Sequence, residues 1–422
     1  MKKIYFDYAA STPVHPEVLH AMEPYFSDMF GNPGSLHSFG QEAIKAIGES
    51  RDTIAKAIGA KFSEIIFTGS ATEANNLALR GALRAFRFEL LGLSSDKKNL
   101  KPKTYNLKPR IIVSAIEHES ILETARDLER DGAEIIYLPV DRRGIVDLVA
   151  LKESLNERTI LLSIMYANNE IGTIQPIREI AEIIADFRNK KEEKLKDKNS
   201  TFYILNSKFY PLFHADAAQA FQFLDCDVNK LGVDLMTLSA HKIYGPKGVG
   251  AFYVRNLKPN TYNLKPIVTG GGQEFGSRSG TENVPSIVGF AEATKLLFSN
   301  SQEHGNRKIA KLRDYFWAEL KKIYPKAELN STEESSLRLP NILNIYFPDH
   351  EAQFLLTKLD LAGVAASSGS ACRSRAVETS HVIEALGHSR ERAKRSIRFS
   401  FGRPTTEKEI KEALKILQDC LA

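Results

Sequence analysis

Cysteine is scarce in this chain: among its 422 residues there are three, Cys226, Cys372 and Cys420. They form no Cys-x-x-Cys pair and no even-numbered set, so the sequence does not indicate a disulfide framework. Isolated thiols of this kind are typical of proteins in a reducing compartment. The scarcity of cysteine therefore excludes a small disulfide-stabilised scaffold. We also predict no metal site.

Long apolar runs are also missing. The N-terminal stretch MKKIYFDYAASTPVHP is interrupted by Asp7 and then by Pro13 and Pro16, so it lacks the apolar core of a signal peptide. No segment approaches the roughly 18 uninterrupted apolar residues that a membrane-spanning helix needs. We therefore expect a cytoplasmic protein without a membrane partner.

An excess of charge of one sign is missing as well. The chain carries 57 lysines and arginines against 52 aspartates and glutamates, a formal net charge of +5. A surface that binds nucleic acid needs a larger or more clustered basic excess. We therefore expect no direct nucleic-acid partner. The hydrophobic share of 43% and the charged share of 26% are those of an ordinary globular protein.

Neither of the two common phosphate-binding loops is present in full. The segment GSATEAN at 69–75 follows an apolar run but lacks the lysine-serine pair of a P-loop. The segment GGGQEFG at 270–276 lacks the glycine spacing of a dinucleotide-binding fold. These absences weigh against a P-loop protein and against a Rossmann-type protein.

Short apolar runs that alternate with amphipathic segments dominate what is present. We expect strands within seven segments, namely 64–68, 110–118, 133–140, 159–168, 212–217, 233–240 and 249–254. Strand–helix alternation of this kind predicts an α/β domain whose sheet is mostly parallel and is covered on both faces. From about residue 300 the pattern changes to that of a smaller α+β domain. A chain of this length favours two domains, and we predict a large domain over 16–300 and a small one formed by 1–15 with 301–422.

One proline-rich sequence occurs twice. NLKPKTYNLKP at 99–109 returns as NLKPNTYNLKP at 256–266. Their prolines disfavour a helix or a central strand, so we interpret both, together with the lysine-rich segment 189–211, as insertions into surface connections. All three are expected to precede strands. They would then lie at the sheet edge opposite the carboxyl ends of the parallel strands, where ligands bind in such sheets.

Polar residues follow several of the predicted strands at their carboxyl ends. The small residues of 69–75 open a helix whose exposed N–H groups suit a phosphate, and His118, Asp216 and Lys242 lie at or just after the ends of three further predicted strands. Each has an ordinary alternative explanation, as a buried histidine, a helix cap or a turn lysine. Together they match pyridoxal phosphate, which needs a lysine to form an imine and a carboxylate to keep its ring nitrogen protonated.

The same motifs carry a family resemblance. From about Ile4 to beyond Arg403 the chain contains, in order, YFDYAASTPV, FTGSATEANNLA, IEHES, NNEIGTIQPI, HADAAQ, SAHKIYGPKGVGAFYVR, GGGQEFGSRSGTEN, SSGSAC and SIRFSFGRPTT. It thereby resembles the cysteine desulfurases of the NifS and IscS type, a class V branch of the fold-type I pyridoxal-phosphate enzymes. The resemblance implies the fold of that enzyme class, which has a large domain with a mostly parallel seven-stranded sheet and a smaller α+β domain.

The resemblance also implies roles for individual residues. Lys242 would form the imine with the cofactor and transfer protons, Asp216 would pair with the ring nitrogen, and His118 would stack on the ring. The phosphate and hydroxyl of the cofactor would be held by Ala71, Thr72, Ser239, His241, Asn169 and Gln219, with Thr281 reaching in from the other subunit of a homodimer. Arg398, together with Asn169, would bind the carboxylate of the substrate, a task that suits a planar bidentate side chain.

Cys372 distinguishes the desulfurases from their relatives. It lies in SSGSACRSR, among small residues that leave a thiol uncovered, whereas Cys226 and Cys420 lack such a setting. The resemblance implies that its thiolate attacks the sulfur of L-cysteine, which leaves a persulfide on Cys372 and releases L-alanine. The sulfur would then pass to acceptor proteins such as an iron–sulfur scaffold or a tRNA-thiolation protein.

Other functions remain open from the sequence. A class V aminotransferase or a selenocysteine lyase would use the same cofactor cage without needing a persulfide. A non-catalytic sulfur-assembly subunit would keep the fold alone, although the joint presence of Lys242, Asp216, His118 and Cys372 argues against it.

Overall fold

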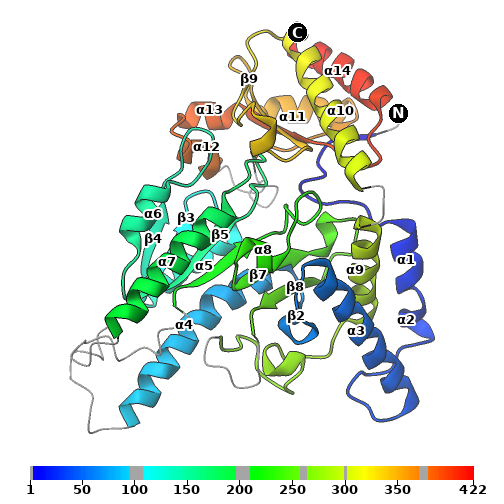
Figure 1. Cartoon of the computed structure of the whole chain (residues 1–422). Coiled ribbons are helices and arrows are strands. Elements are labelled where there is room, and N and C mark those ends of the chain that lie inside the picture. Colours follow the sequence, from blue (N-terminus) through cyan, green and yellow to red (C-terminus); the bar gives the residue numbers. More distant parts are fainter. Residues whose placement is uncertain (1–2, 96–107, 196–209, 257–263, 299–301, 370–378) are drawn as a thin grey trace.

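The computed structural model describes residues 3–95, 108–195, 210–256, 264–298, 302–369 and 379–422 (Figure 1). Its centre is a seven-stranded sheet in the order β2-β8-β7-β6-β5-β3-β4. In this sheet β8 runs antiparallel to β2 and β7, and the other neighbouring pairs are parallel. The predicted mostly parallel sheet is therefore confirmed. The strands are β2 (Ile65–Thr68), β3 (Arg110–Ser114), β4 (Glu134–Leu138), β5 (Thr159–Met165), β6 (Leu212–Asp216), β7 (Leu235–Ser239) and β8 (Gly250–Val254).

Alternating side chains along these strands build a core on each face of the sheet. Ile66 and Val113 belong to the core under α4 and α5, whereas Ile65 and Phe67 belong to the core under α3, α7 and α9. Successive residues of a strand point to opposite faces, and a strand that is buried on both faces becomes a continuous apolar run. The helices around the sheet are α1 (Pro16–Met22), α2 (Pro24–Ser27), α3 (Ser38–Ala57), α4 (Ala71–Ser95), α5 (Glu119–Arg130), α6 (Leu148–Ser154), α7 (Ile177–Leu195), α8 (Val228–Leu231) and α9 (Val284–Leu297).

Most of the remaining elements pack around a separate core, whereas α12 and α13 pack against Ile116, Met165 and Ile171 of the large sheet and its loops; Figure 1 shows where these elements lie. A three-stranded antiparallel sheet has the order β12-β10-β9, and Ile4 and Phe6 from the N-terminal segment join its core. The division of the chain between residues 15 and 16 and between 300 and 301 stays a prediction. Within the described part of the chain, no helix is both long and apolar enough to cross a membrane. The elements are β1 (Ile4–Tyr5), α10 (Gln302–Ile323), β9 (Glu328–Leu329), β10 (Ile342–Tyr346), α11 (Ala352–Leu361), β11 (Val364–Ala365), α12 (His381–Ala385), α13 (Arg390–Lys394), β12 (Ser396–Ser400) and α14 (Glu407–Leu421).

The predicted insertions lie largely outside the described residues, and their visible ends correct two expectations. The segment 189–211 begins as a continuation of α7, which runs to Leu195. The prediction that all three segments precede strands is wrong for 256–266, which follows β8. Because β8 is antiparallel, its last residue, Val254, pairs with Leu235 at the start of β7. This segment therefore leaves the sheet at the edge where the parallel strands begin, opposite their carboxyl ends.

Candidate active site

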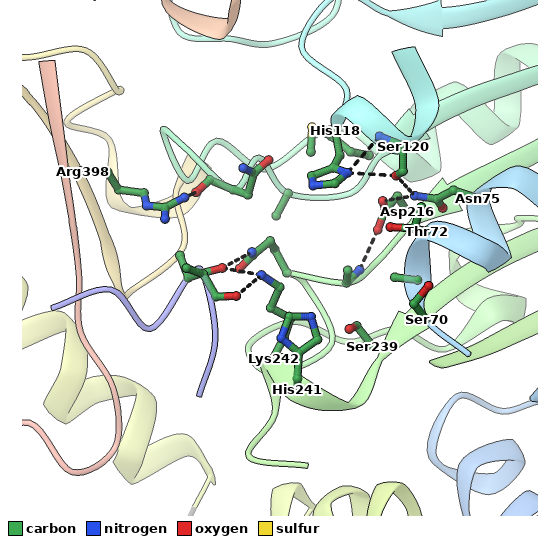
Figure 2. Close-up of a pocket in the computed structure, with 18 residues that line it drawn as sticks. Ser70, Thr72, Asn75, His118, Ser120, Asp216, Ser239, His241, Lys242 and Arg398 are labelled. Atoms are coloured by element: carbon green, nitrogen blue, oxygen red, sulfur yellow. Dashed lines mark hydrogen bonds between the residues drawn. The ribbon is translucent and has the colours of Figure 1, made fainter. Parts of the chain in front are cut away.

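The carboxyl ends of β5, β6 and β7 open into a cavity of about 170 Å³ (Figure 2). Arg398, the predicted substrate-binding residue, lines it, although it lies on β12, far along the chain. The residues predicted to bind the cofactor line it too, except Thr281, so that the cavity wall contains Ala71, Thr72, His118, Asn169, Asp216, Gln219, Ser239, His241 and Lys242.

The N-terminus of α4 forms one corner of this cavity. Ser70 precedes the helix, and its Oγ accepts a hydrogen bond from the N–H of Glu73 across 3.1 Å. Ser239 places a buried Oγ in the cavity wall that has no hydrogen-bond partner among the described residues. Gly250 leaves room for the helix end, since a Cβ there would lie 2.9 Å from the backbone nitrogen of Ala71. A helix N-terminus beside an unsatisfied hydroxyl fits a phosphate, because both offer donors to an anion.

Asp216 supplies the cavity with a buried carboxylate. It is 5% exposed, and it accepts hydrogen bonds from the side-chain amide of Asn75 (2.8 Å) and from the backbone N–H of Ala218 (2.9 Å). Both donors are neutral, so they leave the charge of the carboxylate uncompensated. A buried charge of this kind favours a cationic partner, such as the protonated ring nitrogen that the sequence prediction assigns to it.

His118 is held in one orientation beside this carboxylate (Figure 2). Its Nδ1 accepts the backbone N–H of Ser120 across 3.1 Å and lies 2.9 Å from Ser120 Oγ. In the neutral ring the proton therefore lies on Nε2. Ser120 Oγ also accepts from Nδ2 of Asn75 (2.8 Å), which donates to Asp216 as well. One short network thus fixes both the histidine and the aspartate.

Lys242 ends a short 3₁₀ turn, Ala240–Lys242, that directly follows β7. Its Nζ donates to the carbonyl oxygens of Ala9 (2.6 Å) and Ala10 (2.8 Å). The Gln219 side-chain amide donates to the same Ala9 oxygen across 2.8 Å. The predicted imine-forming amine is therefore inside the cavity, where the N-terminal segment of the chain holds it.

His241 precedes this lysine and is neutral in the folded protein. Burial is the main cause that lowers the pKa of His241 to about 3, and the positive charge of Lys242 acts in the same direction. Its Nδ1 lies 3.4 Å from Ser11 Oγ. At neutral pH this ring can make hydrogen bonds to a phosphate but adds no positive charge to the site.

Arg398 is 1% exposed and has two polar partners in this structure. Nη1 donates to the backbone oxygen of Asn169 across 2.8 Å, and Nη2 donates to Oδ1 of Asp7 across 2.7 Å. The predicted carboxylate-binding side chain thus faces the cavity while it forms an ion pair with a residue of the N-terminal segment.

Two predicted residues are not part of the described cavity. Thr281 lines a different hollow, of about 160 Å³, together with Glu274 and Arg278. Its predicted contribution to the cavity of a second subunit therefore stays a prediction. Cys372 lies outside the described residues, and its role stays a prediction as well.

The structure adds residues to which the sequence interpretation assigned no role, namely Asp7, Asn75 and Ser120. Asn75 could have been found, because it lies four residues after Ala71 and therefore on the same face of α4. Asp7 and Ser120 give no such local signal. Their importance follows from contacts with Arg398 and with His118 and Asn75, which only the folded chain shows.

Comparison with known families agrees with this site. The family described as aminotransferase class-V matches residues 4–90, 95–190 and 206–413. Because this match covers most of the chain, the protein belongs to the class V aminotransferase family.

Individual relatives assign the chain to a narrower group within this family. "Cysteine desulfurase IscS" of Dictyoglomus turgidum is 42% identical over 417 residues, which cover 99% of this chain and 94% of that protein. "Cysteine desulfurase, mitosomal" of Trachipleistophora hominis is 43% identical over 98% of this chain and 85% of its own. A solved NifS-like protein superposes with a TM-score of 0.80 at 34% identity, covering 99% of this chain and 98% of its own. SspA, solved in complex with cysteine, superposes with a TM-score of 0.74 at 33% identity, covering 96% of this chain and 100% of its own. Within class V, the chain belongs to the cysteine desulfurases.

Proposed function

We propose that this chain removes sulfur from L-cysteine with pyridoxal phosphate as its cofactor, giving L-alanine and a persulfide on Cys372. The observation that carries the proposal is the convergence of Lys242, Asp216 and His118 on one cavity that has a phosphate-binding corner. When bound, the cofactor supplies an aldehyde that captures amines and a ring that accepts electrons.

Each residue of the cavity would have a separate role toward that cofactor. The first N–H groups of α4 and the Ser239 hydroxyl would hold the phosphate, and Asp216 would keep the ring nitrogen protonated. His118 would stack on the ring, and Asn169 and Gln219 would hold its hydroxyl side. Lys242 would supply the amine that binds the aldehyde, and it would carry a proton to and from the Cα atom of the substrate.

L-Cysteine would occupy the part of the cavity that Arg398 lines. Arg398 offers a planar set of donors for the α-carboxylate, and a relative with the same fold is described in complex with cysteine. The amino group of the substrate would face the cofactor and Lys242.

Elimination among the three cysteines supports Cys372 as the sulfur acceptor. Burial raises the pKa of the Cys226 thiol, which is 2% exposed, and burial likewise raises the pKa of the Cys420 thiol. Because the thiolate is the attacking species, both are poor nucleophiles. Cys372 is then the remaining candidate.

The described residues on either side of 370–378 lie close to the cavity wall. A Cβ at Gly369 would lie 3.2 Å from Oε2 of Glu170, and the Ser380 hydroxyl donates to that same oxygen. Glu170 follows the cavity residue Asn169 directly. These contacts of Gly369 and Ser380 are consistent with the proposed role of Cys372, which lies between them in the sequence.

We test this function by supplying L-cysteine and a reductant and by quantifying sulfide and alanine together. The two products should appear in equal amounts. Cys372→Ser should lower sulfide release by at least ~100-fold, because it removes the nucleophile, and should keep the visible absorbance of the bound cofactor. Cys226→Ser is the matched control and should retain activity.

Other outcomes would assign the protein elsewhere. Turnover by Cys372→Ser that matches the wild type would indicate a class V aminotransferase or a lyase that needs no persulfide. Failure of the purified wild type to bind pyridoxal phosphate would favour a non-catalytic subunit.

We also propose a homodimer, which hands its sulfur to an acceptor such as an iron–sulfur scaffold or a tRNA-thiolation protein. Exposed apolar side chains are concentrated near α1, α2 and the start of α3, and the rings of Phe30 and Phe39 lie 5.6 Å apart. Apolar surface of this kind favours a protein partner. The exposed residues are Leu19, Phe26, Phe30, Leu36, Phe39 and Ile44.

A further inference from the structure

We propose that Asp7 sets the affinity of the site for carboxylates by competing with the substrate for Arg398. The proposal rests on the function given above, in which Arg398 binds the α-carboxylate of L-cysteine. In the structure this guanidinium already holds a carboxylate. Nη2 of Arg398 lies 2.7 Å from Oδ1 of Asp7, in an ion pair whose side chains are 1% and 17% exposed.

The remaining N–H groups of Arg398 offer a second carboxylate no pair of donors that is independent of Nη2. Nη1 donates to the backbone oxygen of Asn169 (2.8 Å), and Nε is buried without a hydrogen-bond partner among the described residues. A carboxylate that binds arginine through two parallel hydrogen bonds uses Nη2 together with either Nη1 or Nε. Either arrangement brings the substrate carboxylate to the nitrogen that Asp7 occupies.

Two carboxylates on one guanidinium repel each other, and at this degree of burial solvent screens the repulsion only in part. L-Cysteine must therefore either displace Asp7 or bind against its charge, and both reduce its affinity. In the substrate-free protein, by contrast, Asp7 neutralises a buried arginine that would be costly to leave unpaired.

This competition gives the site a means of selection. A carboxylic acid without an amino group has Arg398 as its main anchor and must displace Asp7 with that contact alone. An amino acid also gains attachment through its amino group at Lys242 and the cofactor. Asp7 therefore lowers the affinity of the site for every carboxylate ligand, and an amino acid offsets this loss through its second attachment whereas a simple carboxylate cannot.

The variant Asp7→Asn isolates the charge, because asparagine keeps an acceptor oxygen for Nη2. Two probes separate the carboxylate from the amino group: 3-mercaptopropionate has a carboxylate and a thiol, and cysteamine has an amine and a thiol. With the cofactor-loaded protein in a calorimeter, Asp7→Asn should bind 3-mercaptopropionate about tenfold more tightly than the wild type does. The affinity for cysteamine should stay within about twofold of the wild type.

Steady-state kinetics provide a second readout. The KM for L-cysteine should fall about three- to tenfold in Asp7→Asn, by more than any accompanying change in kcat. The control is Asp360→Asn on α11, an exposed position that changes the net charge equally, and it should match the wild type in both assays. If Asp7→Asn does not fold, Asp7→Ser retains a hydroxyl acceptor and should show the same tightening.

Weaker binding of 3-mercaptopropionate by Asp7→Asn would show that Asp7 merely orients Arg398. Unchanged binding, or no binding to either protein, would show that Asp7 does not compete with a carboxylate or that Arg398 is not the carboxylate site. Each of these results would overturn the proposal. These binding measurements need no turnover. Their failure is therefore distinct from failure of the proposed function, which would appear as a wild type that produces no sulfide from L-cysteine.

Discussion

His214 on β6 is a buried histidine two residues before Asp216. Its Nδ1 lies 2.8 Å from Ser163 Oγ, and its Nε2 lies 3.0 Å from Thr237 Oγ1. One hydroxyl can donate to the ring and the other can accept from it, so both nitrogens are satisfied in the neutral form. Burial lowers the pKa of His214 to about 4, with the nearby Asp216 opposing the effect.

This histidine predicts how stability depends on pH. A histidine in the unfolded chain has a pKa of about 6.5, so between pH 6.5 and pH 4 the unfolded chain binds a proton that the folded protein does not. Stability is therefore lost as the pH falls through this window, by roughly 3 kcal/mol from this residue. Urea titrations at pH 7 and pH 4 should show a smaller loss for His214→Asn than for the wild type. Equal losses in the two proteins would contradict the assignment.

Individual site residues were predictable from the sequence where a chemically suitable side chain lies at the end of a predicted strand. Asp216 ends β6, Lys242 and His118 closely follow β7 and β3, and such strand ends meet at one edge. Asp7 and Ser120 could not be predicted in this way, because their functions depend on partners from distant parts of the chain.

At the scale of elements, the corner between α4 and β8 positions the predicted phosphate site. Gly250 pairs with Thr68 on one side and with Ser239 on the other. Its missing side chain lets the start of α4 approach the end of β7. The small residues of GSATEAN were recognisable in the sequence, but the requirement for glycine at 250 was not, because it arises from three elements that meet in space.

We predict that Gly250→Ala weakens the affinity for pyridoxal phosphate by at least ~10-fold, since overpacking costs about 1–3 kcal/mol. The new Cβ would lie 2.8 Å from the carbonyl carbon of Ser70 and 3.0 Å from the backbone oxygen of Leu238. Backbone atoms cannot move aside as a side chain can, so the helix end would shift. Titration of the cofactor absorbance measures the effect. In Gly305→Ala on α10 the Cβ would meet open space, and unchanged affinity is expected there.

Strand positions were predictable because buried strands are continuous apolar runs, but strand directions were not. The run at 249–254 resembles its neighbours in composition, yet β8 is antiparallel. Direction depends on the connection, and the short turn from Lys242 to Val249 leaves too little chain for the crossover that a parallel neighbour needs. The wrong prediction for 256–266 has another cause, since the chain after this segment continues to a short 3₁₀ helix at Glu274–Gly276 and to α9 rather than to a strand.

At the scale of the whole molecule, the concentration of apolar side chains on residues 19–44 is the main feature that a single chain does not explain. Leu36 is 93% exposed there, and Leu361 on α11, elsewhere in the molecule, is 83% exposed. The proposed dimer would cover the first of these surfaces. Sequence patterns predict which helices are amphipathic but do not show which exposed face a second copy covers.

We predict that Leu36→Asp lowers the fraction of dimer in sedimentation experiments at micromolar concentration, because it would bury an unpaired charge in the interface. Cofactor affinity should fall with it if Thr281 acts from the other subunit. Leu361→Asp is the matched control and should stay dimeric. A dimer that persists in Leu36→Asp but dissociates in Leu361→Asp would place the interface on α11 instead.

The covalent attachment of the cofactor tests the central claim most directly. The protein is incubated with pyridoxal phosphate, reduced with borohydride, digested and mapped by mass spectrometry. The account predicts the reduced phosphopyridoxyl group on Lys242, at the end of β7. Label on another lysine such as Lys247, or no label at saturating cofactor, would contradict it.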